Sequence, residues 1–103
     1  MRVAAMLERA SAEDRRRFIR HPVSFGAGLS SANDRPATPV TVVDLSAHGC
    51  GIEVSGHCEP GSRVWLRLPG LESWPARIVW AQGDRAGLSF DRPLHQGVVD
   101  RYA

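Results

Sequence analysis

The sequence predicts an all-β domain, either a small barrel or a sandwich, from three observations. Six segments alternate apolar and polar residues with the period of half-buried strands. Turn-forming residues separate these segments at intervals of about eight to twelve residues. The chain has 103 residues, enough for one domain with a modest core. The predicted strands cover residues 23–30, 40–43, 50–55, 63–68, 74–80 and 86–90.

The first two predicted strands lie on either side of a polar turn. Residues 23–30 alternate apolar side chains with small or polar ones, as a strand with one buried face does. Residues 31–36 read Ser-Ala-Asn-Asp-Arg-Pro, which is the composition of a turn. The valine-rich second strand then ends near Asp44.

The third and fourth strands are bounded by glycine and proline. Residues 50–55 alternate in the same way, and the following residues 55–61 contain Gly56, Pro60 and Gly61. Residues 63–68 alternate again, until Pro69 and Gly70 break the pattern. Both segments are therefore short strands that end in turns.

The last two strands form a predicted hairpin, residues 74–80 and 86–90, around a turn at residues 82–84. Pro93 can start a short helix that continues through Tyr102.

Three tryptophans lie on these strands. Alternation places Trp74 and Trp80 on the inner face of the fifth strand. Trp65 falls on the outer face of the fourth strand, where it is a candidate marker of a partner surface.

Charge is nearly balanced over the chain but locally uneven. Thirteen arginines, no lysine and eleven acidic residues give a net charge of +2. Residues 1–21 hold six arginines and three acidic residues, whereas the remainder holds seven arginines and eight acidic residues. This local basic charge is too small for a large duplex-DNA footprint but sufficient for a small dianion.

Several features favour a cytoplasmic protein. Cys50 and Cys58 are too few for a disulfide framework. No apolar run approaches the length that spans a membrane. Residues 1–7 are too short and too quickly charged for a secretory signal. We therefore expect the cytoplasm as the location and no membrane insertion.

Four of the six residues from Arg15 to Arg20 are arginines. A guanidinium group is always charged and offers a planar fork of donors that fits phosphate or the acceptor edge of guanine. Arg16 and Arg20 lie four residues apart, so either a helix or an extended segment presents them on one side. The cluster precedes the strand pattern, so we expect a flexible arm that captures a nucleotide; the alternative is a solvated basic tail.

A second group of polar residues lies between the second and third strands. Asp44 offers two acceptor oxygens, Ser46 offers a donor and an acceptor, and Gly49 lets another group approach its backbone. Asp44 and Ser46, separated by one residue at a strand end, can face the same ligand. The alternative is an Asx-type turn that only connects the strands.

The two groups together resemble the PilZ domain, a bacterial receptor family for cyclic dimeric GMP (cyclic di-GMP). The pattern is Arg-x-x-x-Arg at Arg16 and Arg20, followed about twenty-five residues later by Asp-x-Ser-x-x-Gly at Asp44, Ser46 and Gly49. Each motif is weak alone, but both occur in order on a six-strand pattern.

Neighbouring segments extend this resemblance to roughly residues 14–95. Residues 20–23 resemble the family's entry into its first strand, residues 49–52 the strand after its second motif, and residues 79–90 its closing hairpin. The resemblance implies a six-stranded antiparallel β-barrel in residues 14–95. It leaves an N-terminal arm at residues 1–13 and a short C-terminal helix or tail at residues 96–103.

The resemblance also implies a ligand and roles for the site residues. Arg16 and Arg20 would bind guanine O6 and N7 and the phosphates of cyclic di-GMP. Asp44 would accept hydrogen bonds from guanine N1–H and the exocyclic amine. Ser46 would bond a base or a phosphate, and Gly49 would permit close approach.

Arg15 precedes the first motif and resembles the family variant that binds an intercalated pair of ligands, whose four phosphate charges suit an extra cation. The arm lacks apolar periodicity, so ligand is expected to order it over the mouth of the barrel. The ordered arm would change the surface seen by an unidentified downstream protein.

Two other functions remain as alternatives. A PilZ-like adaptor that no longer binds nucleotide is possible, although both motifs are present. An RNA- or single-stranded-DNA-binding barrel would interleave basic and aromatic residues on its strands, but here the strands offer only Arg63, Arg67 and Arg77 beside Trp65. We therefore expect no DNA or RNA partner.

Enzymatic function is not expected. The sequence argues for no Ser-His-Asp arrangement and no pair of catalytic carboxylates. His48 and His57, together with Cys50 and Cys58, lack the spacing of a metal site. We expect no catalytic residue, no metal and no cofactor, and a binding protein whose ligand is cyclic di-GMP.

Overall fold

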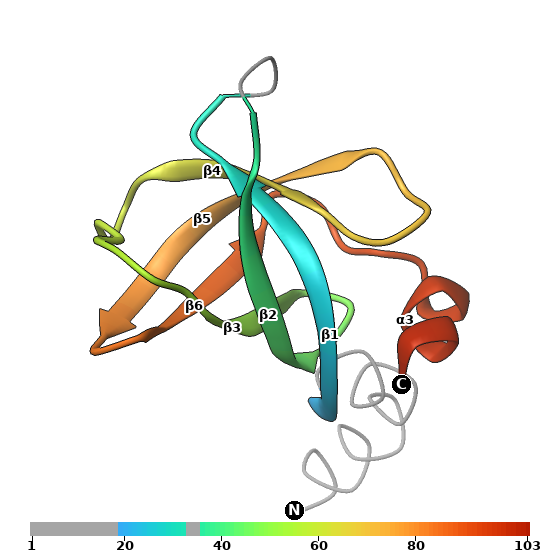
Figure 1. Ribbon diagram of the computed structural model, residues 1–103. Helices are drawn as coiled ribbons and strands as arrows, with labels where there is room; N and C mark the ends of the chain where they lie inside the picture. The colour runs from blue at the N-terminus through green and yellow to red at the C-terminus, as the bar shows by residue number, and fades with distance from the viewer. Residues whose placement is uncertain (1–18, 33–35) are drawn as a thin grey trace, which may run out of the picture.

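The computed structural model describes residues 19–32 and 36–103 as a closed barrel of six strands with a short helix beside it (Figure 1). The expected arm at residues 1–13, together with Arg15 and Arg16, lies outside the described residues. The elements are β1 (His21–Ser30), β2 (Thr38–Leu45), β3 (Gly49–Glu53), β4 (Arg63–Arg67), β5 (Ser73–Gln82), β6 (Arg85–Phe90) and α3 (Gln96–Tyr102).

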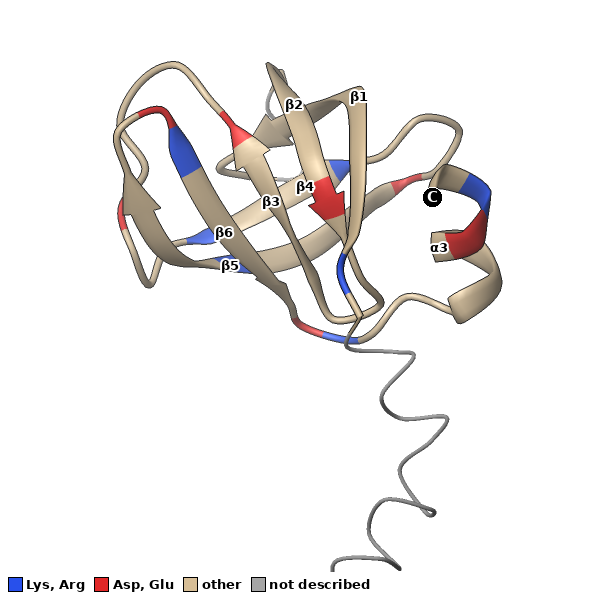
Figure 2. Ribbon diagram, turned by 90° about the horizontal axis from the view of Figure 1, so that it is seen from below, with Lys and Arg blue, Asp and Glu red and all other residues tan. Residues whose placement is uncertain are grey.

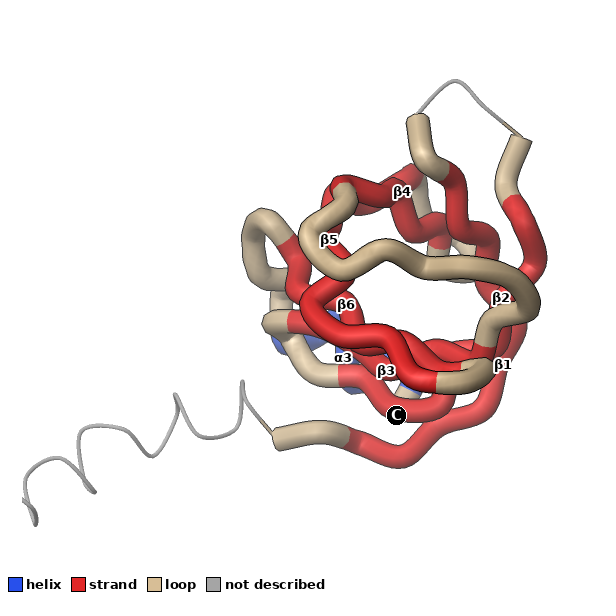
Figure 3. The backbone as a smooth tube through the Cα atoms, turned by 90° about the vertical axis from the view of Figure 1, so that its left-hand side faces the viewer, coloured by secondary structure: helices blue, strands red, loops and turns tan. Residues whose placement is uncertain are grey.

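The barrel is antiparallel throughout, in the strand order β1-β2-β3-β6-β5-β4. Pairing of β1 with β4 closes the ring, with Leu29 opposite Leu66. Figure 3 shows the strands as a ring around the interior. All six predicted strands are confirmed, and the β1–β4 pairing decides between the barrel and the sandwich.

The core fills the barrel with the inward-facing side chains that alternation predicts. Its largest fully buried members come from β2, β3, β4, β6, the turn after β4 and α3: Leu45, Ile52, Leu66, Leu68, Leu88, Val42, Val99 and Cys50. Each inner residue is flanked on its strand by outward neighbours, as in β4, where Val64 and Leu66 are buried between exposed Arg63 and Arg67.

The β5–β6 hairpin turns within two residues, Gly83 and Asp84. Gly83 has a φ of 62°, a conformation that costs glycine little and other residues more. The sequence places glycine at the one position of this tight turn that requires it.

The prediction that Trp80 lies on the inner face is wrong. The β5–β6 register shifts between Ile78 and Trp80, so that Val79 and Trp80 are both exposed while Ile78 stays buried. Such a bulge adds a residue to one strand and reverses which faces the later side chains occupy. Trp74 precedes the shift and packs against the core as predicted.

Helix α3 begins at Gln96, after Pro93 rather than at it. The His95 side chain caps its N-terminus by accepting from Gly97 N–H at 3.0 Å. Val99 is fully buried, and the Tyr102 ring stacks on Phe25 of β1 with 5.0 Å between ring centroids. The helix therefore covers one side of the barrel near β1.

We predict that Ile52→Ala lowers the free energy of unfolding by about 2–5 kcal/mol, because it leaves a cavity in a side-chain position with no solvent exposure. Val79→Ala, at a position that is 54% exposed, should change it by less than about 0.5 kcal/mol. Urea unfolding followed by circular dichroism measures both. Equal losses would contradict the described core.

The Cys50 thiol makes the stability of the barrel depend on pH. Burial is the main reason that the pKa of the Cys50 thiol is raised from 9.0 to about 12. The Asp44 carboxylate also raises this pKa, and the Arg20 guanidinium lowers it. Between these values the folded chain keeps the thiol proton while the unfolded chain releases it. Stability from this group is therefore complete below pH 9 and is lost as the pH rises toward 12.

We predict that raising the pH from 8 to 10.5 costs wild type about 2 kcal/mol more than it costs Cys50→Ala, which has no thiol to titrate. Urea unfolding of both proteins at the two pH values gives this difference. Parallel pH profiles would contradict the assignment.

Candidate functional site

The candidate site lies at the end of the barrel where β1 begins, β2 ends and β3 begins. Pro22 of β1 is the register partner of Asp44, and Asp44 is also the partner of Gly51 in β3. Figure 2 shows the acidic end of β2 beside the start of β1. Antiparallel pairing thus brings residues more than twenty positions apart in sequence into one place.

A register irregularity turns Asp44 outward. Val40 and Val42 face the core, so strict alternation would direct Asp44 inward as well. The β2–β3 register shifts between Val42 and Asp44, and Leu45 takes the buried position instead, with no exposure. The bulge therefore presents the Asp44 carboxylate at the surface, which avoids the free-energy cost of burying its charge in the core.

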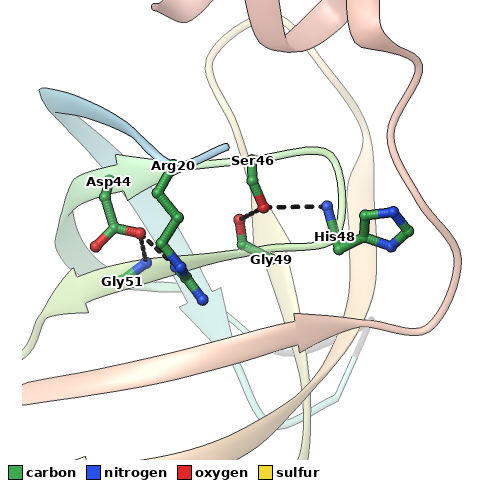
Figure 4. A network of polar contacts seen from close by, with 6 residues as sticks. All are labelled: Arg20, Asp44, Ser46, His48, Gly49 and Gly51. Atoms are coloured by element: carbon green, nitrogen blue, oxygen red, sulfur yellow. Dashed lines mark hydrogen bonds and ion pairs between the residues drawn. The ribbon is translucent and has the colours of Figure 1, made fainter. Parts of the chain in front are cut away.

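The Asp44 carboxylate is held by two donors. Its Oδ1 atom accepts from Nη1 of Arg20 as an ion pair and from the backbone N–H of Gly51 at 3.0 Å (Figure 4). The side chains of Arg20 and Asp44 keep 49% and 32% of their surface exposed. The pair is thus in position, yet open to solvent and to a ligand.

Ser46 belongs to a separate network. The residue is only 4% exposed. Its hydroxyl accepts a hydrogen bond from the His48 N–H at 3.2 Å and donates one to the Gly49 carbonyl oxygen at 3.4 Å. Figure 4 shows this contact set beside, and not joined to, the Arg20–Asp44 pair. In this structure Ser46 stabilises the tight connection between β2 and β3.

Two glycines of β3 lie close to neighbouring groups. A Cβ atom at Gly49 would overlap the carbonyl oxygen of Leu88 in β6, and one at Gly51 would overlap Oδ2 of Asp44. The close approach predicted for Gly49 is thus made by strand β6.

The structure brings together some of the predicted site residues. Arg20 and Asp44 are in contact, Ser46 lies in the adjoining loop and Gly49 begins β3 after it. Arg15 and Arg16 lie outside the described residues. Sequence reasoning missed Gly51, although a glycine inside a strand pattern signals a close backbone approach.

The loop between β2 and β3 is also fixed by the neighbouring strand β6 and the segment that follows it. Its Ala47 and His48 carbonyl oxygens accept from the N–H groups of Leu94 and Phe90, each at 2.8 Å. A loop anchored by backbone hydrogen bonds keeps its shape better than one held by side chains alone.

Chemically, the exposed pair offers a fork of donors beside a pair of acceptors, which matches the edge of a planar polar ring. Among residues 19–32 and 36–103, no group of three or more His, Cys, Asp and Glu side chains could hold a metal ion. Within the same ranges, no helix is long and apolar enough to cross a membrane.

Comparisons with known proteins agree with this geometry. The family model described as the PilZ domain matches residues 14–101. A similar solved structure is the PilZ domain of CeSA from a cellulose-synthesizing bacterium, with 23% identity and a TM-score of 0.58. The alignment covers 70% of this chain and 79% of that one, and the likeness shows the fold. The comparison with curated proteins found no match. Because the family model covers most of the sequence and the barrel has the same fold, the chain belongs to the PilZ domain family.

Proposed function

We propose that this protein binds cyclic di-GMP, the ligand for which the PilZ family is known. The observation that carries the proposal is the surface contact between Arg20 and Asp44, one residue from each motif, in a chain that contains both motifs. Fold alone would not support it, because function depends on the groups that a fold presents.

Guanine complements this pair specifically. Its O6 and N7 atoms accept, as Arg20 requires, while its N1–H and exocyclic amine donate, as Asp44 requires. Without ligand the two side chains satisfy each other. A guanine base can replace that contact with bonds to both. Adenine keeps the N7 acceptor but offers a donor at the position of O6, so Arg20 would lose its bidentate contact.

The remaining motif residues complete the proposed site. Arg16 would bind the second face of the base or a phosphate, and Arg15 would offset the charge of a second ligand molecule. Ser46 and Gly49 would act through the loop: Ser46 holds it with two hydrogen bonds, and Gly49 lets it lie against β6.

The proposed signal is ordering of the arginine-containing arm over the barrel. The ligand's phosphates attract the arginines, and contacts formed on both sides would fix the arm against the end of the barrel. Ordering would consume a few kcal/mol of the contact free energy. A partner protein would then meet a different surface with and without ligand.

A second candidate function is a PilZ adaptor that does not bind nucleotide. Two observations favour it: the Ser46 hydroxyl is buried in contacts within its own loop, and Arg20 and Asp44 already satisfy each other. Calorimetry separates the two candidates, since an adaptor of this kind gives no heat with the nucleotide.

We predict saturable heat with cyclic di-GMP and little or none with cyclic di-AMP or GTP, measured by isothermal titration calorimetry. Arg20→Ala and Asp44→Ala should each weaken binding by about 5-fold to 150-fold, because each removes the free energy of one good bidentate contact with a base. Arg16→Ala should weaken it similarly.

The matched control is Arg101→Ala, which removes an exposed arginine from α3, away from the motifs. It should leave the affinity unchanged. The same titrations report stoichiometry, which should fall from two ligands per chain to one in Arg15→Ala.

Equal heat with all three nucleotides, or none with cyclic di-GMP, would contradict the proposed function.

We also predict that cyclic di-GMP slows tryptic cleavage after Arg15, Arg16 and Arg17, because an ordered arm cannot enter the protease. Mass spectrometry of timed digests measures each cut separately. Cleavage after Arg101 serves as the internal reference and should not change. Unaltered cleavage of the arm at saturating ligand would disprove arm ordering while leaving binding intact.

A further inference from the structure

The outer surface of strands β4, β5 and β6 combines arginine with exposed apolar side chains. We call it the β4–β6 face and define it by Arg63, Trp65, Arg67, Arg77, Val79 and Trp80. Figure 2 shows the arginine-containing segments of these strands in blue. The face is distinct from the Arg20–Asp44 site.

Strand pairing places these residues side by side. Arg63 is the register partner of Arg77, and Trp65 is the partner of Pro75, so the two strands present them on the same outer side. The alternating residues Val64 and Leu66 point into the core. The composition of this face is therefore set by the strand pattern.

The bulge in β5 adds the apolar part. Val79 and Trp80 are 54% and 44% exposed, and in the described ranges the only other exposed large apolar residue is Ile19, next to Arg20. A Cβ atom at Gly87 would overlap the Trp80 indole, so this ring packs on the Gly87 backbone. A half-exposed aromatic ring is a common anchor at protein interfaces.

The arginines of the face are only partly neutralised. Arg63 pairs with Asp91. Arg77 donates only to the Gly61 carbonyl oxygen, at 3.3 Å. In the part of the chain that the structure describes, no carboxylate pairs with Arg67 or Arg77.

We propose that the β4–β6 face binds an acidic segment of a partner protein that also carries apolar side chains. Carboxylates would pair with Arg67 and Arg77, whose fork geometry suits them, and apolar groups would cover Val79 and Trp80. The strands form a closed barrel with no free edge, so the segment binds through side chains and not by adding a strand.

Charge excludes the chain itself as the occupant. Residues 1–21 carry six arginines against three acidic residues and would be repelled, as would the same face of a second copy. A polyanionic nucleic acid is also disfavoured. The ranges 19–32 and 36–103 contain seven arginines and seven acidic residues, so they create no overall positive field.

The size of the face sets the length of the segment. Pro75, beside Trp65, and Trp80 are five positions apart in β5, which is about 16 Å along a strand. An extended segment of about five or six residues spans this distance. Only every second residue of an extended segment faces the surface, so acidic and apolar residues should alternate among those positions, as Arg63, Trp65 and Arg67 do on β4.

The test uses a fluorescein-labelled synthetic peptide of about ten residues. Every second residue is in turn glutamate and leucine or phenylalanine, so that both kinds lie on one side, and the positions between them are serine. Fluorescence anisotropy should show saturable binding that weakens as NaCl is raised. A peptide with glutamine in place of glutamate should bind at least tenfold more weakly. No saturable binding, or equal binding of both peptides, overturns the proposal.

Variants locate the binding surface. Arg67→Glu combined with Arg77→Glu should weaken peptide binding at least tenfold, and the melting temperature confirms that the variant is folded. The control is Arg101→Glu on α3, compared with Arg77→Glu alone, which changes the net charge by the same two units. Arg77→Glu alone should still weaken binding, and Arg101→Glu should leave it unaltered. Equal losses in these two single variants indicate a general charge effect and overturn the proposal.

The three tryptophans supply an independent readout in a ¹⁵N–¹H spectrum of the full chain. The indole signals of Trp65 and Trp80 should shift on adding the peptide. The Trp74 indole N–H donates to the Arg92 carbonyl oxygen at 2.9 Å and should stay in place. Shifts confined to Trp74, or tighter binding of an oligothymidine of equal charge than of the peptide, overturn the proposal.

Discussion

Strand β3 imposes the constraint on which both barrel closure and the candidate site depend. It is paired on both sides, with β2 and with β6, and four of its five residues are buried. A side chain at Gly49 would overlap the backbone carbonyl oxygen of Leu88, so glycine there lets β3 and β6 pair at this spacing, whereas one at Gly51 would overlap only the Asp44 carboxylate. The backbone N–H of Gly51 then holds the Asp44 carboxylate.

Two register irregularities convert a uniform barrel into one with distinct surfaces. The shift after Val42 turns Asp44 outward toward Arg20, and the shift after Ile78 turns Trp80 outward over Gly87. Each bulge changes the face of every residue that follows it on its strand. A polar site and an apolar patch thus arise without disturbing the core, because Leu45 takes the buried position after the first shift.

One segment, residues 90–94, connects the two surfaces. Phe90 and Leu94 donate backbone hydrogen bonds to the loop that carries Ser46, while Asp91 pairs with Arg63 on the β4–β6 face. These backbone hydrogen bonds and this ion pair form a continuous set of contacts, and two sites can influence each other through such contacts. The fold therefore places the candidate nucleotide site and the proposed partner surface in contact through a few residues.

The sequence alone determined the strands, the turns, the fold class and the pairing of two motifs, because alternation with period two and the positions of glycine and proline are local properties. It also named Arg20 and Asp44 as members of one site, on the strength of the family resemblance. The strand pattern left barrel and sandwich open, and the family resemblance predicted the barrel, which the β1–β4 pairing confirms. The sequence did not show that Trp80 faces solvent. That exposure, and the burial of Ser46, arise from register between strands distant in sequence, which only the tertiary structure fixes, because a one-residue shift reverses the face that each side chain occupies.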